Sequence, residues 1–154
     1  MNGKPRDMIK NWGPVGVWMV VIFLFSTDLF SGAHTSSLLG PFLSALFPAI
    51  TADQIDALHL ALRKLGHWSE YFILASLLTR ALGKEFPRQT RIARWVWCVG
   101  IATLYAASDE WHQSFVPSRT ASLADVAIDS FGAICGALWF NGRRRTLPAI
   151  QEKQ

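Results

Sequence analysis

The sequence predicts an all-α membrane protein with four transmembrane helices and an interfacial amphipathic helix in the first outer loop. Hydrophobic residues make up 51% of the 154-residue chain and charged residues only 17%, which is more apolar than an ordinary soluble domain of this size. Four apolar runs approach the roughly 20 residues that a helix needs to cross a bilayer. The basic residues gather near alternate ends of these runs, as expected for a chain that crosses a membrane repeatedly.

The four predicted spans cover residues 12–30, 67–83, 92–111 and 122–140, each bound being approximate. They form one transmembrane domain over residues 12–140, with cytoplasmic tails over 1–11 and 141–154. No convincing signal-peptidase site follows the first run, so we expect a retained first span. Both cysteines lie inside apolar runs, and the sequence indicates no disulfide framework.

The distribution of Lys and Arg predicts the orientation of the chain. Twelve of the 15 basic residues lie in the two tails and in the connection between the second and third spans. Cytoplasmic loops carry an excess of Lys and Arg, so both termini are expected in the cytoplasm. Most acidic residues and all four histidines then lie at or near the outer face. Membrane lipids are the predicted partners, and we expect no nucleic-acid binding.

The first outer connection contains an amphipathic segment over residues 51–66. Thr51 and Gln54 form a capping-box pattern at its start, and Gly66 is expected to end the helix. Its apolar residues share one helical face: Ile55, Leu58, Leu62 and Leu65. Two interpretations stay open, a helix lying in the outer membrane interface and a lid over an outer site.

Ionisable residues gather at the outer ends of three predicted spans. Because side chains three, four and seven positions apart share a helical face, each span presents one polar stripe. Charged groups at this depth avoid lipid, so we expect the stripes to converge. A Gly-x-x-x-Gly pattern on the last stripe should let a neighbouring helix approach closely. The stripes are His67, Glu70 and Tyr71; Tyr105, Asp109 and His112; and Asp125, Asp129, Gly132 and Gly136.

Three interpretations of these stripes remain open: a polar network that only holds the helices together, a binding or catalytic pocket, and a metal site. In a catalytic pocket, an imidazole acts as general acid or base while a carboxylate fixes its tautomer. The catalytic candidates are His67, Glu70, Asp109, Glu110 and His112, although Glu110 points away from the Asp109 stripe. The substrate-binding candidates are Tyr71, Gln113, Arg119, Asp125 and Asp129.

Two further expectations concern charge partners and metal ions. Arg119 is the expected partner of Asp125 or Asp109, because a guanidinium can hold a carboxylate through two hydrogen bonds. A zinc or manganese ion would find two imidazoles and two carboxylates on adjacent helices. Those candidate metal ligands are His67, Glu70, Asp109 and His112. The sequence identifies no cofactor.

Two blocks of sequence resemble the VanZ-like family of small bacterial membrane proteins. The first, RKLGHWSEYFILASLLTRAL, contributes Lys64, His67, Glu70 and Tyr71. The second, DEWHQSFVPSRTASLADVAIDSFGAICG, is the more specific block. Its matching residues, with the preceding serine, are Ser108, Asp109, Glu110, Gln113, Pro117, Arg119, Asp125, Gly132 and Gly136.

The resemblance implies a multi-span helical protein of the bacterial inner membrane. For the founding member it implies low-level resistance to the glycopeptide teicoplanin. We therefore expect an outer-leaflet polar pocket with a role in envelope modification or protection, with a lipid-linked cell-wall precursor or a glycopeptide as further partners. The alternative is a membrane-embedded hydrolase or transferase that acts on a lipid-linked precursor or a lipid headgroup.

Overall fold

The computed structural model describes residues 5–27, 32–117, 119 and 121–146. Within these residues the chain forms five helices and no strand, so the all-α prediction is confirmed. The helices are α1 (Pro5–Phe25), α2 (Gly32–Leu46), α3 (Ala52–Glu85), α4 (Arg91–Gln113) and α5 (Leu123–Thr146). Helices α1 and α5 extend into the predicted tails, and residues 28–30 of the first predicted span lie outside the described residues.

Two helices are long and apolar enough to cross a membrane, α1 over Arg6–Phe25 and α5 over Leu123–Asn141. Most of α1 is exposed, with only 11% of its apolar stretch buried inside the structure. Helices α3 and α4 are long enough to cross a membrane, but polar residues interrupt their apolar stretches and make them less apolar than α1 and α5. Large hydrophobic side chains are exposed along α1, α4 and α5, among them Val17, Val20, Phe23, Val96, Trp97, Leu104, Phe131, Leu138 and Trp139.

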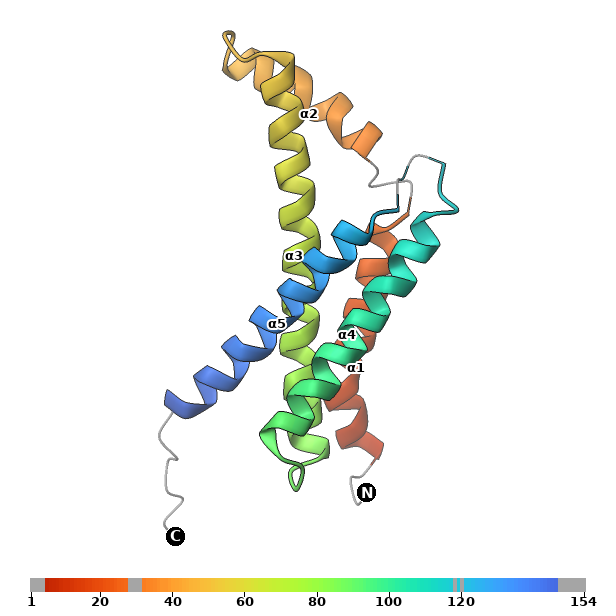
Figure 1. Cartoon of the computed structure of the whole chain (residues 1–154), viewed down its shortest axis with the longest axis vertical. Helices are drawn as coiled ribbons and strands as arrows, with labels where there is room; N and C mark the ends of the chain where they lie inside the picture. The colour runs from red at the N-terminus through yellow and green to blue at the C-terminus, as the bar shows by residue number, and fades with distance from the viewer. Residues whose placement is uncertain (1–4, 28–31, 118, 120, 147–154) are drawn as a thin grey trace.

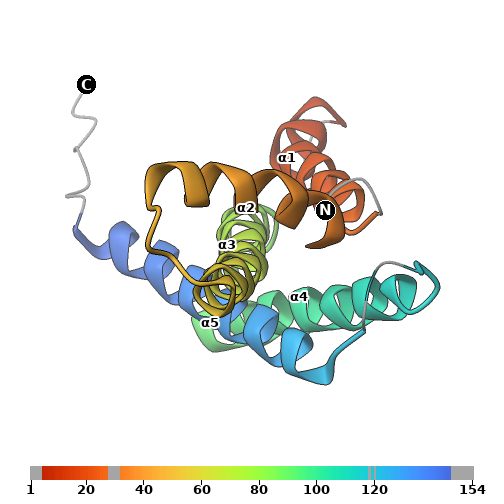
Figure 2. The ribbon, with the colours of Figure 1, turned by 90° about the horizontal axis from the view of Figure 1, so that it is seen from above.

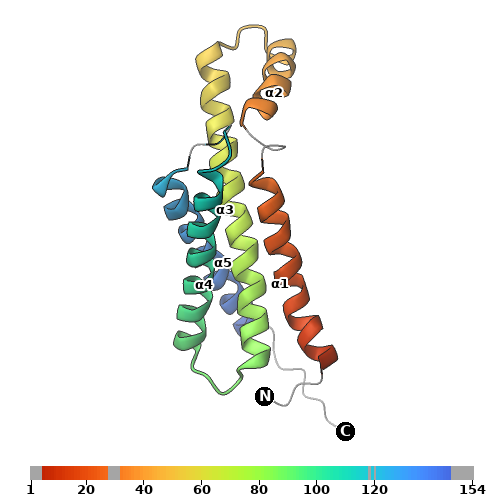
Figure 3. The same ribbon diagram turned by 90° about the vertical axis from the view of Figure 1, so that its right-hand side faces the viewer.

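Helix α3 occupies the centre of the molecule. It packs against α1, α2, α4 and α5, and its contact with α5 is the most extensive. Seen from above, the other helices surround it (Figure 2). The start of α1, the turn from α3 to α4 and the end of α5 lie at one end of the molecule (Figures 1 and 3). The polar ends of α4 and α5 lie toward the opposite end.

Small and medium-sized side chains form the buried core around α3. Fully buried alanines on α3, α4 and α5 allow the helix backbones to approach closely. They include Ala75, Ala102, Ala106, Ala133 and Ala137. Tyr71, Leu74 and Leu78 fill the remaining space along α3. Close packing of these side chains holds α3 against α4 and α5.

The prediction of a separate amphipathic helix ending at Gly66 is wrong. Residues 52–85 form one continuous helix of 34 residues, about 51 Å long at 1.5 Å per residue. A helix-ending glycine usually adopts a positive φ, and no described glycine does so. The capping box of Thr51 and Gln54 at the start of α3 is confirmed.

Helix α2 was not predicted from the sequence. It contains Gly40 and Pro41, residues that usually indicate a turn or loop. It lies beside the N-terminal part of α3, which extends beyond the ends of α4 and α5 (Figures 1 and 3). The first connection therefore adds a helical cover at the polar end of the molecule.

Candidate functional site

The polar stripe of α3 forms one wall of the site. His67, Glu70 and Tyr71 share a helical face as predicted, with His67 and Tyr71 buried and Glu70 partly buried. Tyr71 packs its ring 6.3 Å from the ring of Tyr105 on α4. Tyr105 in turn donates a hydrogen bond to the carbonyl of Met19, which ties α4 to α1. The aromatic residues thus fix the three helices around the stripe.

Helix α5 approaches α3 at its two interior glycines, as the Gly-x-x-x-Gly pattern predicted. A Cβ atom on Gly132 would lie 2.3 Å from the carbonyl oxygen of Trp68, and one on Gly136 would lie 2.1 Å from that of Phe72. No side chain larger than hydrogen fits at either position. This close crossing, visible where α5 passes obliquely over α3 (Figure 1), brings the carboxylates of α5 against α3.

Both carboxylates of α5 meet partners on α3. Asp125 accepts a hydrogen bond from the ammonium of Lys64 at 2.7 Å and lies 3.5 Å from the guanidinium of Arg63. Asp129 lies 3.3 Å from Nδ1 of His67. Both aspartates are buried. Basic residues that precede the buried part of α3 therefore neutralise Asp125, whereas the ion-pair partner of Asp129 among the described residues is an imidazole.

Arg119 does not pair with Asp125 or Asp109, so the expected ion pair is wrong. Its guanidinium instead donates to the backbone carbonyls of Phe25 and Thr27, the second at 3.1 Å. The last carbonyls of a helix have no hydrogen-bond donor within the helix, and Arg119 donates to carbonyls at the end of α1. Partial burial lowers the pKa of Arg119, and the nearby charge of Arg63 acts in the same direction.

Helix α4 contributes two adjacent carboxylates with different surroundings. Asp109 accepts a hydrogen bond from the side-chain amide of Gln113 at 3.1 Å. Glu110 accepts one from the backbone N–H of Ser122 at 2.7 Å, just before α5 begins. Although Glu110 and Gln113 point away from the centre of the predicted stripe, both are buried. Glu110 thus joins the end of α4 to the start of α5.

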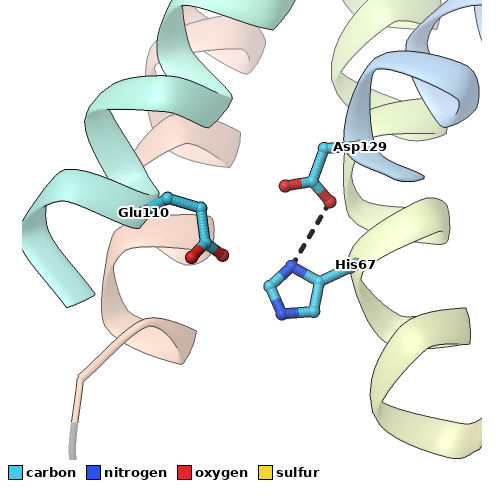
Figure 4. Close-up of side chains that lie close together, drawn as sticks. All are labelled: His67, Glu110 and Asp129. Atoms are coloured by element: carbon cyan, nitrogen blue, oxygen red, sulfur yellow. Dashed lines mark ion pairs between the residues drawn. The ribbon is translucent and has the colours of Figure 1, made fainter. Parts of the chain in front are cut away.

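Three ligand-type side chains meet at the crossing of α3, α4 and α5. Potential ligand atoms of His67, Glu110 and Asp129 all lie within 4.8 Å of one another. Figure 4 shows the two carboxylates pointing toward the imidazole, each from its own helix. Only His67 belongs to the metal-ligand set expected from the sequence; the group that lies close enough together among the described residues does not include Glu70, Asp109 or His112. His112 instead packs its ring 4.7 Å from that of Phe23 on α1.

A cavity of about 290 Å³ opens beside this cluster. It is close to the lower end of the size range of small-molecule sites. Its apolar wall comes from Phe25, Leu39 and Leu62. Its polar lining is His59, Arg63, His67, Glu70, Asp109, Gln113 and Arg119, together with Ser26 and Gly66.

The structure divides the predicted site residues into three groups. His67, Glu70, Asp109, Gln113 and Arg119 line the cavity. Four predicted site residues lie outside the cavity lining: Tyr71, Glu110, Asp125 and Asp129. Glu110 and Asp129 lie close to His67, and Tyr71 shares its helical face. Asp125 pairs with Lys64 and Arg63. His112 belongs to neither group: its ring packs against Phe23 of α1, and it interacts electrostatically with Asp109.

Sequence reasoning missed His59 and Leu39 as lining residues. His59, Arg63 and His67 recur every four residues, which places them on one face of a helix. That signal was hidden because the helix was expected to end at Gly66. Leu39 belongs to α2, a helix that no pattern in the sequence predicts.

These features define a class of all-helical protein with apolar outward faces and a buried cluster of ionisable side chains at one end. Residues 12–144 match the model of the VanZ/LLP1 family. The chain belongs to that family, which confirms the resemblance in its sequence motifs. Comparisons with curated proteins and with solved structures give no significant match. Family membership and the two apolar helices together indicate a membrane protein.

Proposed function

We propose that this protein crosses the bacterial inner membrane four times, through α1, the C-terminal part of α3, α4 and α5. The exposed apolar faces of α1, α4 and α5 support this, because large exposed apolar surfaces mark contact with lipid or a partner. Basic residues at the end of the molecule that holds the turn from α3 to α4 indicate the cytoplasmic side. They include Lys10, Arg80, Lys84, Arg88, Arg91 and Arg94. Both ends of the chain then face the cytoplasm, and the cavity opens at the outer leaflet.

We propose further that the cavity binds the phosphate-bearing headgroup of an envelope lipid or a lipid-linked cell-wall precursor. The observation that carries this proposal is a pair of guanidinium groups, Arg63 and Arg119, in one cavity with an apolar wall. Arg recognises phosphate oxygens through paired N–H donors. Because the two groups repel each other, an anion between them would relieve that repulsion. The apolar wall suits the first carbons of the attached lipid chain.

In the cell, this binding would alter the outer surface that a lipophilic glycopeptide meets. That role extends to this chain what the resemblance implies for the founding member of the VanZ-like family, namely low-level resistance to teicoplanin. The protein would hold or mask an anionic lipid at the outer leaflet. A susceptible cell that gains the protein should therefore tolerate more teicoplanin.

The test is expression of the wild type and of Arg63→Gln and Arg119→Gln in a teicoplanin-susceptible host that lacks a related gene. The wild type should raise the minimum inhibitory concentration of teicoplanin, and both variants should lose that rise. Arg91→Gln, an exposed arginine at the opposite end of the bundle, is the matched control and should behave as wild type. Folded protein in each membrane is measured by size-exclusion chromatography in detergent. No rise with well-folded wild type, or full protection by Arg119→Gln, would refute the role.

A second candidate is a hydrolase or transferase that acts on the bound headgroup. The observation that favours it is the position of His67, which lines the cavity and has Asp129 on its Nδ1 side. A buried carboxylate beside an imidazole can stabilise the charge that the ring acquires when it acts as a general base. Turnover of a radiolabelled lipid-linked precursor by purified wild type, absent in His67→Gln, would support this candidate. Binding without any product would exclude it for that substrate.

A further inference from the structure

The cluster of His67, Glu110 and Asp129 contains buried polar atoms without hydrogen-bond partners. These atoms are Nδ1 of His67, Oε1 of Glu110 and both carboxylate oxygens of Asp129. The side chain of Asp129 is 0% exposed. A buried carboxylate without hydrogen bonds is among the most costly groups in a protein interior. The cluster therefore requires a partner beyond the interactions that these side chains make with one another.

The contact between His67 and Asp129 does not meet that requirement. Nδ1 of His67 and Oδ1 of Asp129 lie 3.3 Å apart, yet the pair lacks the geometry of a hydrogen bond. Two ligands of one metal ion stand about 3 to 3.5 Å apart when each metal–ligand bond is about 2.1 Å. The observed distance fits two neighbouring ligands of a shared cation.

The charge balance of the region favours a cation. Five carboxylates interact electrostatically around His67: Glu70, Asp109, Glu110, Asp125 and Asp129. Three permanently cationic side chains of the described residues lie among them, namely Arg63, Lys64 and Arg119. Asp125 engages the first two, and Arg119 binds backbone carbonyls. Among the described residues, Glu110 and Asp129 therefore have no Arg or Lys as an ion-pair partner.

We propose that His67, Glu110 and Asp129 bind a divalent transition-metal cation, with Zn²⁺ and Mn²⁺ as the best candidates. One imidazole nitrogen and two carboxylate oxygens form a mixed set that suits both ions. Glu110 is already anchored, since its Oε2 accepts the N–H of Ser122 and leaves Oε1 for the metal. The ligand atoms of the three residues lie within 4.8 Å of one another, so a bound ion would draw the Glu110 side chain closer to the other two.

Three protein ligands leave at least one coordination position for an outside molecule. His67 also lines the cavity, so that position is next to the space occupied by the proposed headgroup. The cation would add a third positive centre to the two guanidinium groups. With His67 as a ligand, its Nδ1 is not a general base, and any activation of water falls to the cation. Metal binding itself does not depend on which headgroup the cavity accepts.

The test uses the full chain, purified in detergent with a tag that contains no histidine. The protein is stripped with EDTA, freed of chelator and titrated with Zn²⁺ and with Mn²⁺ by isothermal calorimetry. We expect one saturable equivalent per chain for at least one ion, and a higher melting temperature in its presence. A stripped wild type that binds neither ion saturably and melts at the same temperature with and without them overturns the proposal.

Isosteric variants locate the site. Asp129→Asn and Glu110→Gln should each weaken metal affinity by at least about 100-fold, because even loss of a supporting outer residue costs 10- to 100-fold. Asp109→Asn removes a carboxylate that is as buried as Glu110 but lies outside the ligand set. It should weaken metal affinity by less than about 10-fold. Circular dichroism checks the helical content of each variant. If Asp129→Asn does not fold, Glu110→Gln decides, and equal affinities for Glu110→Gln and Asp109→Asn would overturn the assignment.

Discussion

Replacement of Gly136 by alanine tests the close crossing on which the site depends. The added Cβ would lie 2.1 Å from the carbonyl oxygen of Phe72, whereas ordinary contact begins at 3.4 Å. Helices α3 and α5 must therefore separate by the difference, about 1.3 Å. Overpacking of this kind costs about 1–3 kcal/mol, and the clash is with a backbone atom that has no rotamer to change. We take the upper value, about 3 kcal/mol.

Part of this cost is offset by the higher helix propensity of alanine, which is worth up to about 1 kcal/mol over glycine. The expected net loss is about 2 kcal/mol, which lowers the melting temperature by about 4–8 °C for a chain of this length. The assay is thermal unfolding of the purified protein in detergent, followed by circular dichroism. Separation of the helices also withdraws Asp129 from His67, so Zn²⁺ should raise the melting temperature of the variant less than that of wild type.

Gly100→Ala provides the matched control. Gly100 lies inside α4, and a Cβ there would meet nothing within 4 Å. The same chemical change should leave the melting temperature unchanged or raise it slightly. If Gly136→Ala is as stable as Gly100→Ala, α5 does not cross α3 at the distance described, and the reasoning about the carboxylates of α5 fails with it.

Two further substitutions test the contacts around the site by the same thermal assay. Lys64→Met should lower the free energy of unfolding by about 1–2 kcal/mol. This is less than the loss of a fully buried pair, because Lys64 is 35% exposed and Arg63 still faces Asp125. A double variant that also carries Asp125→Leu should recover part of this stability, and no recovery would argue against the ion pair. Tyr105→Phe should cost about 1 kcal/mol through the lost hydrogen bond to Met19. An unchanged melting temperature for Tyr105→Phe would show that this bond does not tie α4 to α1.

The sequence was sufficient for the features that follow from local periodicity and residue size. The spacing of His67, Glu70 and Tyr71 predicted their common face, and the spacing of Gly132 and Gly136 predicted the close approach of α5. Both predictions depend only on helix geometry and on the absence of a side chain. Neither requires knowledge of which helices are neighbours.

Features that depend on tertiary contacts could not be read from the sequence. Gly66 was expected to end a helix, but a glycine is tolerated inside a helix where the flanking residues continue the pattern. Arg119 was expected to bind a carboxylate, whereas it donates hydrogen bonds to the backbone carbonyls of Phe25 and Thr27 at the end of α1. Glu110 had no explanation until the start of α5 and the imidazole of His67 were seen beside it.

The central claim is that the cavity with Arg63 and Arg119 binds an anionic phosphate headgroup. Native mass spectrometry of the purified protein with phosphatidylglycerol, and with diacylglycerol of the same acyl chains, tests this claim most directly. The proposal predicts saturable binding of phosphatidylglycerol by wild type, weak binding of diacylglycerol, and loss of the preference when both arginines are replaced by glutamine. Equal binding of the two lipids by wild type, or an unchanged preference in the double variant, would contradict it.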